Sequence, residues 1–225
     1  VETVLHFPTR GRNLLRIQGD LLAAYALGIR NLFVVMGDPT RIGDFPEAMD
    51  TYDIVPTGLI ELIKKQLNQG VDKAGLSIDH ATNFTVGCAL NLTPHDPERE
   101  MTLLRKKIDN GADFALTQPI FDAIAAKQFV ERYEATYQEP ILPLIAGIKP
   151  LYNSRNAEFL HHEVPGMNIP DEQRERMRQA VKPKQEGVLI AQETLAQVKA
   201  FSQGVYLMPA FGRYDLVADV IDSLG

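Results

Sequence analysis

Two polar side chains follow apolar stretches of the sequence, at positions where a strand would end. Asp38 comes two residues after the run Leu32–Met36, and Gln118 comes directly after Phe114–Thr117. A carboxylate at such a position can stabilise a developing positive charge. A carboxamide can donate and accept hydrogen bonds at once, as recognition of a fused heterocycle requires. Each residue also fits a purely structural role, Asp38 in a Gly-Asp-Pro turn and Gln118 as a cap of the next helix.

Three basic side chains add candidate contacts for anions and rings. His6 lies in the run Thr3–Phe7 ahead of a polar turn. Arg213 follows the run Gly204–Met208, where its guanidinium could bind a substrate carboxylate through two hydrogen bonds. Lys107 lies on a predicted helix, from which its ammonium could reach a phosphate. The structural alternatives are a hydrogen-bonded histidine in a capped turn, a solvated surface lysine, and an arginine paired with surface carboxylates.

Other reactive side chains and motifs give no signal. Cys88 lies inside an apolar run and is expected to be an inert core residue, and the His161-His162 pair is expected to be solvated. The sequence has no Gly-x-Gly-x-x-Gly after a strand, no Walker loop, no Gly-x-Ser-x-Gly and no His-Glu-x-x-His. A dinucleotide, if bound, is therefore not held in the Rossmann manner, and we predict no metal site.

Composition narrows the class of protein. The 225 residues are 45% apolar and 23% charged, which suits one α/β domain with a single large core. The net charge of −6 argues against a broad surface for nucleic acid or anionic membrane, so the partners are expected to be small molecules. One cysteine, no apolar run near the roughly 20 residues of a membrane span, and no signal peptide indicate a cytoplasmic protein. Because Val1 is not a Met, the chain is expected to start within a longer protein.

Short apolar runs alternate with stretches of helical periodicity, the pattern of repeated βα units and a parallel sheet. Aspartates suited to cap helices precede Pro97 and Ala123. The expected strands are Thr3–Phe7, Leu32–Met36, Phe84–Leu90, Phe114–Thr117, Ile141–Ile148 and Gly204–Met208. The expected helices are Leu14–Leu27, Leu59–Asn68, Pro97–Asn110, Ala123–Tyr137, Glu186–Phe201 and Tyr214–Leu224, with extra pieces at Asn153–Leu160 and Pro170–Ala180.

This alternation explains why the candidate residues could meet. In parallel α/β folds, ligands gather at the carboxyl ends of the strands, which is where the polar residues named above fall. Gly37–Pro56, rich in Gly, Asp and Pro, is expected to be a long ordered loop of the functional kind. Six βα units fit either an open doubly wound sheet or most of an eight-unit barrel, which two further N-terminal units would complete.

Several motifs, in matching order and spacing, resemble the methylenetetrahydrofolate reductase family. They are His6-Phe7-Pro8-Thr9-Arg10-Gly11-Arg12-Asn13, Met36-Gly37-Asp38-Pro39, Gly111-Ala112-Asp113-Phe114-Ala115-Leu116-Thr117-Gln118-Pro119, Arg155-Asn156-Ala157, Glu163-Val164-Pro165-Gly166, Glu186-Gly187-Val188 and Gly204-Val205-Tyr206-Leu207-Met208-Pro209. The likeness extends along the whole chain. It is greatest to bacterial reductases fused behind a homocysteine methyltransferase domain.

The resemblance implies a fold and an activity. The fold would be a (β/α)8 TIM barrel that in this chain lacks its first two β/α units, with residues 1–225 forming a single reductase domain. FAD would lie at the carboxyl ends of the strands and pass hydride to 5,10-methylenetetrahydrofolate, giving 5-methyltetrahydrofolate. NADH or NADPH would supply the electrons. The setting would be cytoplasmic one-carbon metabolism and methionine biosynthesis, with a homo-oligomer or an attached methyltransferase domain as possible partners.

The resemblance also implies roles for individual residues. Asp38 would be catalytic, stabilising the cationic iminium opened from the substrate, while Gln118 would bind the pterin and Arg213 the substrate tail. Asn156 and Leu160 would replace a Gln and a Phe of the nicotinamide pocket, and Ala89 stands where some members have an aromatic residue, so the donor stays open. The family's general acid, a Glu at the end of the first strand, would lie upstream of Val1, so this chain could bind without turnover. The cofactor contacts would be His6, Met36, Gly37, Asp38, Ala89 and Lys107.

Two other functions stay open at this point. One is a flavin- or folate-binding barrel without reductase activity that serves an attached methyltransferase domain. The other is an unrelated phosphate-binding barrel enzyme.

Overall fold

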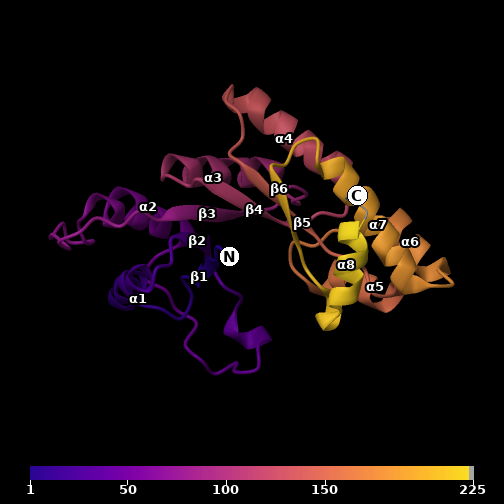
Figure 1. Ribbon diagram of the computed structural model, residues 1–225, viewed down its shortest axis with the longest axis horizontal. Coiled ribbons are helices and arrows are strands. Elements are labelled where there is room, and N and C mark those ends of the chain that lie inside the picture. The colour runs from indigo at the N-terminus through magenta and orange to yellow at the C-terminus, as the bar shows by residue number, and fades with distance from the viewer. Residues whose placement is uncertain (223–225) are drawn as a thin grey trace. The chain divides into compact units, whose positions relative to one another are not determined.

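The computed structural model describes residues 1–222, and it has the alternating βα architecture that the sequence predicts (Figure 1). In this part of the chain six strands are hydrogen-bonded in sequence order. The strands are β1 (Val4–Pro8), β2 (Asn31–Val35), β3 (Thr85–Leu90), β4 (Phe114–Pro119), β5 (Leu144–Ile148) and β6 (Gly204–Leu207). The α-helices are α1 (Leu14–Ala26), α2 (Pro56–Lys65), α3 (Pro97–Asp109), α4 (Ala123–Tyr137), α5 (Ser154–Glu163), α6 (Asp171–Gln179), α7 (Pro183–Val198) and α8 (Tyr214–Asp222).

The strand order and the parallel pairing confirm the predicted α/β fold with the βα pattern of a TIM barrel. Helices α2 and α7 end three residues earlier than predicted, and α5 ends three residues later. The largest differences in where elements begin occur at prolines. Helices α2 and α7 begin three residues earlier than predicted, because Pro56 and Pro183 occupy first-turn positions where a missing N–H costs nothing. Strand β5 begins at Leu144 rather than Ile141, after Pro143, which cannot donate to the ladder. Residues 223 and 224 of the last predicted helix lie outside the described residues.

The predicted helix ends are confirmed. Asp122 Oδ1 accepts a hydrogen bond from the Ala125 amide at 2.9 Å, and Asp96 Oδ1 accepts one from the Arg99 amide at 3.0 Å. Three glycines that follow helices have φ of +82° to +101°, values that side-chain-bearing residues rarely adopt. They are Gly28, Gly70 and Gly111.

The chain divides into two compact units, and each is described by itself. The first comprises Val1–Ala89 and Thr102–Ala115. Here β1 pairs with β2 and β2 with β3, all parallel. Its core holds fully buried aliphatic side chains from β2, from α2 and from the turn after α2. They include Leu32, Leu59, Ile60, Leu62, Ile63 and Leu67.

The long loop that follows β2 is ordered, as predicted. Arg10 holds it: Nη1 contacts Asp50 Oδ1 at 2.8 Å, and Nε donates to the Gly37 carbonyl oxygen at 3.0 Å. A bridge between Arg12 and Tyr52 adds a second attachment. The loop is thereby tied to the residue that precedes Asp38.

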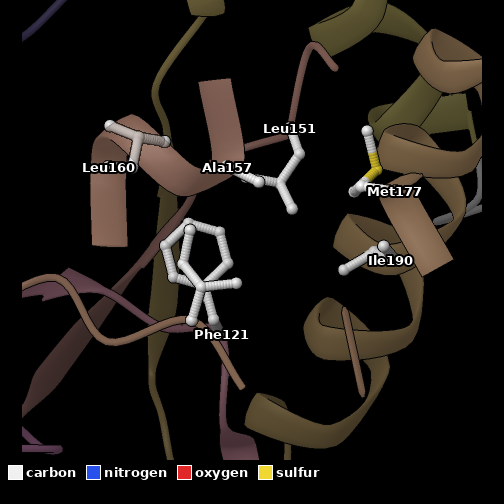
Figure 2. Packing of buried hydrophobic residues seen from close by; sticks show 7 residues of the cluster. Phe121, Leu151, Ala157, Leu160, Met177 and Ile190 are labelled. Atoms are coloured by element: carbon white, nitrogen blue, oxygen red, sulfur yellow. The ribbon is translucent and has the colours of Figure 1, made fainter. Parts of the chain in front are cut away.

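The second unit comprises Leu90–Met101 and the chain from Leu116 onward. Here β5 pairs in parallel with β6, and the two predicted extra helices are present as α5 and α6. Figure 2 shows the hydrophobic cluster that these helices form with α7 and the end of β4. Its buried members are Phe121, Leu151, Ala157, Leu160, Ile169, Met177 and Ile190.

Helix α7 approaches this cluster closely because it has a glycine at the contact. A Cβ added to Gly187 would overlap the carbonyl oxygen of Leu151, a backbone atom that cannot swing aside. The glycine is therefore required by packing. Within residues 1–222, no helix is both long enough and apolar enough to cross a membrane.

We predict opposite effects for two glycine substitutions in helices. Gly187→Ala should lower the free energy of unfolding by at least about 1–3 kcal/mol, because the methyl group overpacks the contact with Leu151. Gly19→Ala is the matched control: Gly19 lies inside α1, is exposed, and has no atom within 4 Å of an added Cβ. That substitution should raise the free energy of unfolding by up to ~1 kcal/mol. Chemical denaturation measures both, and equal effects would contradict the packing argument.

Candidate functional site

Asp38 lies just beyond the carboxyl end of β2, and its side chain is exposed. The carboxylate has no hydrogen-bond or ion-pair partner among residues 1–222. Gly37 before it has φ of +86°, and an added Cβ would lie 3.2 Å from the Pro8 side chain. The backbone thus turns sharply and presents the carboxylate to solvent, where a ligand can reach it.

Two other predicted cofactor contacts, His6 and Met36, lie near the end of β2 and differ in how firmly they are held. The His6 imidazole is exposed, and its ring packs edge-on against Phe33 with centroids 4.9 Å apart. It makes no hydrogen bond within the described part of the chain, so the structure does not show the hydrogen-bonded histidine of the structural alternative. Met36 is held by the buried Thr9, whose hydroxyl lies 3.3 Å from the Met36 sulfur.

A pocket of about 440 Å³ opens in the first unit beside the ends of β2 and β3. Three of the predicted cofactor contacts, Met36, Ala89 and Lys107, line it together. Other walls are largely apolar, from β2, the start of α2 and Leu103 of α3. His6, Gly37 and Asp38 do not line this pocket.

Lys107 is not the solvated surface lysine of the structural alternative. Its side chain is 7% exposed, and Nζ donates to the Ala89 carbonyl oxygen at 2.7 Å. Among residues 1–222 this neutral carbonyl is its only partner, which leaves a buried ammonium without an anion. A buried charge is costly unless it is paired, so the Lys107 ammonium favours a ligand with an anionic group. The apolar walls of the pocket favour a ligand whose remaining part is apolar.

In the second unit, Gln118 is exposed at the end of β4, and backbone bonds fix the chain on either side of it. The Gly147 amide of β5 donates to Thr117 Oγ1 at 2.9 Å, and the Gly147 carbonyl oxygen accepts from the Ile120 amide at 2.9 Å. The Thr117 hydroxyl in turn donates to the Gln118 carbonyl oxygen at 2.8 Å. These bonds fix the backbone from which the carboxamide extends.

Tyr206 of β6 completes this network. Its hydroxyl donates to the Thr117 carbonyl oxygen at 2.6 Å, and burial raises the pKa of the phenol to about 12. The ring crosses β5 at Gly147, where an added Cβ would lie 2.6 Å from the phenol oxygen. The glycine of β5 therefore lets the tyrosine of β6 reach β4.

A second pocket, of about 580 Å³, lies in this unit around the loops that follow β5 and β6. Asn156 and Arg213, both predicted to bind substrate, line it with Tyr152, Arg155, Phe159 and Phe211. Arg213 is paired with Asp215, with Nε 2.8 Å from Oδ1, as its structural alternative expects. Asn156 Oδ1 accepts from the Tyr152 amide at 3.2 Å, so part of its side chain is already engaged.

Two predicted positions have surroundings that differ from those expected. Leu160 is 6% exposed and packs in the hydrophobic cluster with Phe121 and Leu151, so it does not line the second pocket. Of the His161-His162 pair, His162 is exposed as predicted, whereas His161 is only partly exposed: its Nδ1 accepts from the Ile169 amide at 3.2 Å, and desolvation, followed by the nearby Arg174 charge, lowers its pKa. Cys88 is buried, as predicted.

Sequence reasoning missed three polar residues, two that directly follow strands and one within the last strand. Asn91 follows β3, and its Nδ2 donates to the Gly166 carbonyl oxygen at 3.3 Å, in a loop that lies beside Gln118. Lys149 follows β5 directly, and Tyr206 lies within β6. The rule that selected Asp38 and Gln118 would have found Asn91 and Lys149, since both come directly after apolar runs.

Comparison with known proteins gives a consistent set of relatives. A sequence profile of the family described as methylenetetrahydrofolate reductase matches residues 1–219. A probable methylenetetrahydrofolate reductase (NADH) of Oryza sativa subsp. japonica is 26% identical over 163 residues, covering 68% of this chain and 25% of its own. A probable methylenetetrahydrofolate reductase (NADPH) of Caenorhabditis elegans is 27% identical over 180 residues, covering 76% and 24%. The chain thus spans about a quarter of the length of these curated relatives.

Among solved structures, an uncharacterised protein from Clostridium thermocellum that binds two copies of 5-methyl-5,6,7,8-tetrahydrofolic acid has a similar fold. The TM-score is 0.50 at 15% identity, over 98% of this chain and 92% of that one. This likeness concerns the fold.

We predict that the network behind Gln118 can be weakened in steps. Tyr206→Phe should lower the free energy of unfolding by about 1 kcal/mol, the usual net worth of one hydrogen bond. Thr117→Val should cost about 1–3 kcal/mol, because the buried Gly147 amide loses its acceptor. Tyr214→Phe, at a tyrosine that is 73% exposed, is the control and should change little. Denaturation curves that rank Tyr206→Phe with Tyr214→Phe would contradict the role of the network.

Proposed function

Because the chain belongs to the methylenetetrahydrofolate reductase family, we propose that it serves the reduction of 5,10-methylenetetrahydrofolate to 5-methyltetrahydrofolate with bound FAD. The single observation that carries the proposal is the family match along residues 1–219. The Clostridium thermocellum protein that binds 5-methyltetrahydrofolic acid supports a folate ligand for this architecture. The pockets described above supply the chemistry that the reaction needs.

The first-unit pocket fits a flavin cofactor. Its apolar walls suit a flat ring, and the buried Lys107 ammonium, whose only partner is a carbonyl, suits a phosphate. Met36 and Ala89 would lie against the cofactor, with the Gly37 backbone and His6 at the neighbouring strand ends. Bound FAD would supply the hydride for the reduction.

Asp38 is the residue we propose as catalytic. When the imidazolidine ring of the substrate opens, N10 takes up a proton from an acid, the N10–methylene bond breaks with its electron pair remaining on N10, and a cationic iminium forms at N5. A carboxylate beside this cation stabilises it electrostatically, provided the carboxylate is not already neutralised. The exposed Asp38 side chain, which has no partner within residues 1–222, meets that condition.

Gln118 is proposed to bind the pterin, since its carboxamide can donate and accept along the ring edge. The Thr117–Gly147 bonds hold its backbone in place before a ligand arrives, so less conformational entropy is lost on binding. Arg213 is proposed to contact the substrate tail. Because Asp215 already pairs with Arg213, a tail carboxylate would have to share the guanidinium.

Reduced nicotinamide is proposed as the electron donor, because curated relatives are named as NADH or NADPH enzymes. Asn156 lines the second pocket and is proposed to face the nicotinamide. Leu160 is proposed to support this region through the hydrophobic cluster rather than by direct contact. From the motif likeness to bifunctional bacterial reductases, we also propose a cytoplasmic role in methionine biosynthesis beside a homocysteine methyltransferase domain, in a homo-oligomer.

The function is tested by following flavin absorbance. The purified chain should bind FAD and lose the oxidised-flavin band on addition of NADH or NADPH. The return of that band on addition of 5,10-methylenetetrahydrofolate tests for folate reduction, a step that also needs a proton donor to N10. If the purified chain binds neither flavin nor folate, the proposed function is excluded.

Substitution of the carboxylate should separate the two half-reactions. Asp38→Asn should keep flavin bound and slow reoxidation by the folate by about 100-fold, while reduction by the nicotinamide slows much less, because only the folate step develops a cation. Stopped-flow absorbance measures each step by itself. Equal losses in both steps would reject the role of Asp38.

Removal of the buried Lys107 ammonium should weaken the binding of FAD, which carries phosphates, more than the binding of riboflavin, which carries none. Lys107→Met should raise the dissociation constant for FAD about tenfold or more and leave that for riboflavin, which has no phosphate, nearly unchanged. Lys73→Met, at an exposed lysine of the same unit, is the control for loss of charge. An equal loss for riboflavin would instead assign Lys107 a packing role.

A further inference from the structure

Lys149 is an unusual lysine by position and surroundings. It follows β5 directly, at the carboxyl end where ligands bind in parallel α/β folds. The preceding residue, Ile148, is 1% exposed, and Pro150 and Leu151 after it are also buried. Lys149 is thus half-buried within an apolar segment.

The ammonium of Lys149 has no partner. Within residues 1–222 it makes no hydrogen bond and no ion pair, and desolvation lowers its pKa. Removing a charged group from water without a counter-charge destabilises the fold. Such a residue costs stability in the ligand-free protein, and sites of this kind are often functional.

The first turn of α5 carries a second cation without a carboxylate partner. Arg155 is exposed, lines the second pocket and makes no ion pair among the described residues, while Lys184 of α7 lies over the Tyr152 ring, 5.1 Å from its centroid. The other arginine that lines this pocket, Arg213, is paired with Asp215. Unpaired cations are notable in a chain whose net charge is −6.

We propose that Lys149 and Arg155 form an anion-binding site at the carboxyl end of β5, which takes a ligand group carrying several carboxylates or phosphates. An incoming anion would supply the counter-charge that the folded chain lacks, and would do so most strongly at the half-buried Lys149. The inference rests on the proposed function for its two sources of anion. These are the glutamyl carboxylates of a folate and the phosphates of a nicotinamide dinucleotide.

The test compares ligands that differ only in negative charge. The chain is titrated calorimetrically with 5-methyltetrahydrofolate, with its triglutamate form, and with 5-methyltetrahydropterin, which has no glutamyl tail. ADP-ribose and 2′-phospho-ADP-ribose form the phosphate arm. Lys149→Met should weaken the binding of either the triglutamate folate or 2′-phospho-ADP-ribose about tenfold. It should weaken the binding of the tail-less pterin by less than about twofold.

Matched variants separate charge from packing. Lys149→Arg should keep most of the affinity, and Lys199→Met, an exposed lysine of the same unit just before β6, should keep all of it. High salt should reduce the difference between wild type and Lys149→Met, since screening weakens the ion pair. Lys149→Met should also raise the midpoint of thermal unfolding, because the uncompensated charge is gone.

The outcomes are distinguishable. A loss confined to glutamylated folates identifies the carboxylate source, and a loss confined to the phosphorylated nucleotides identifies the phosphate source. Equal binding by wild type and Lys149→Met for every ligand, or an equal loss for the tail-less pterin, overturns the anion site and leaves the proposed function intact. If wild type binds neither folate nor nucleotide, both proposals fail.

Discussion

The end of a parallel strand leaves backbone carbonyls that need donors, and in this chain side chains from other elements supply them. Lys107 donates to the Ala89 carbonyl, Tyr206 to the Thr117 carbonyl, and Arg10 to the Gly37 carbonyl. Buried polar groups in proteins are nearly always satisfied, so these donors are structural requirements. They are also what fixes the residues beside them, which are the ones we assign to cofactor and substrate.

This arrangement joins stability to function. Lys107 donates one hydrogen bond to the Ala89 carbonyl and also lines the pocket, so in the function we propose the same side chain would support the strand end and bind an anionic ligand. The Tyr206 hydroxyl has no comparable spare capacity and serves the backbone next to Gln118. Lys149 is the opposite case, because it makes no hydrogen bond or ion pair among residues 1–222, and the role we propose for its charge depends on a bound anion.

Much of the fold could be predicted from the sequence, because apolar runs and helical periodicity report burial directly. The six strands and eight α-helices of residues 1–222 were all expected close to their observed positions, and the largest shifts in starting residue came at Pro56, Pro143 and Pro183, where proline changes which residue can begin an element. The strand-end rule placed Asp38 and Gln118 correctly at the ends of β2 and β4. It did not reveal which side chains support them, since the bond from Tyr206 to Thr117 spans 89 residues and leaves no local pattern. Burial of Lys107 was equally invisible, because a lysine on an amphipathic helix gives the same pattern whether it is exposed or covers a strand end.

Arg10, in the turn after β1, links that turn to two other segments, because its guanidinium donates to the Gly37 carbonyl after β2 and to Asp50 far along the loop. The loop therefore cannot swing outward as an independent flap, because doing so would break the ion pair that shares a side chain with the backbone next to Asp38. Access to the carboxylate and order in the loop are mechanically linked through one residue. A ligand that displaced the loop would also loosen the turn that presents Asp38.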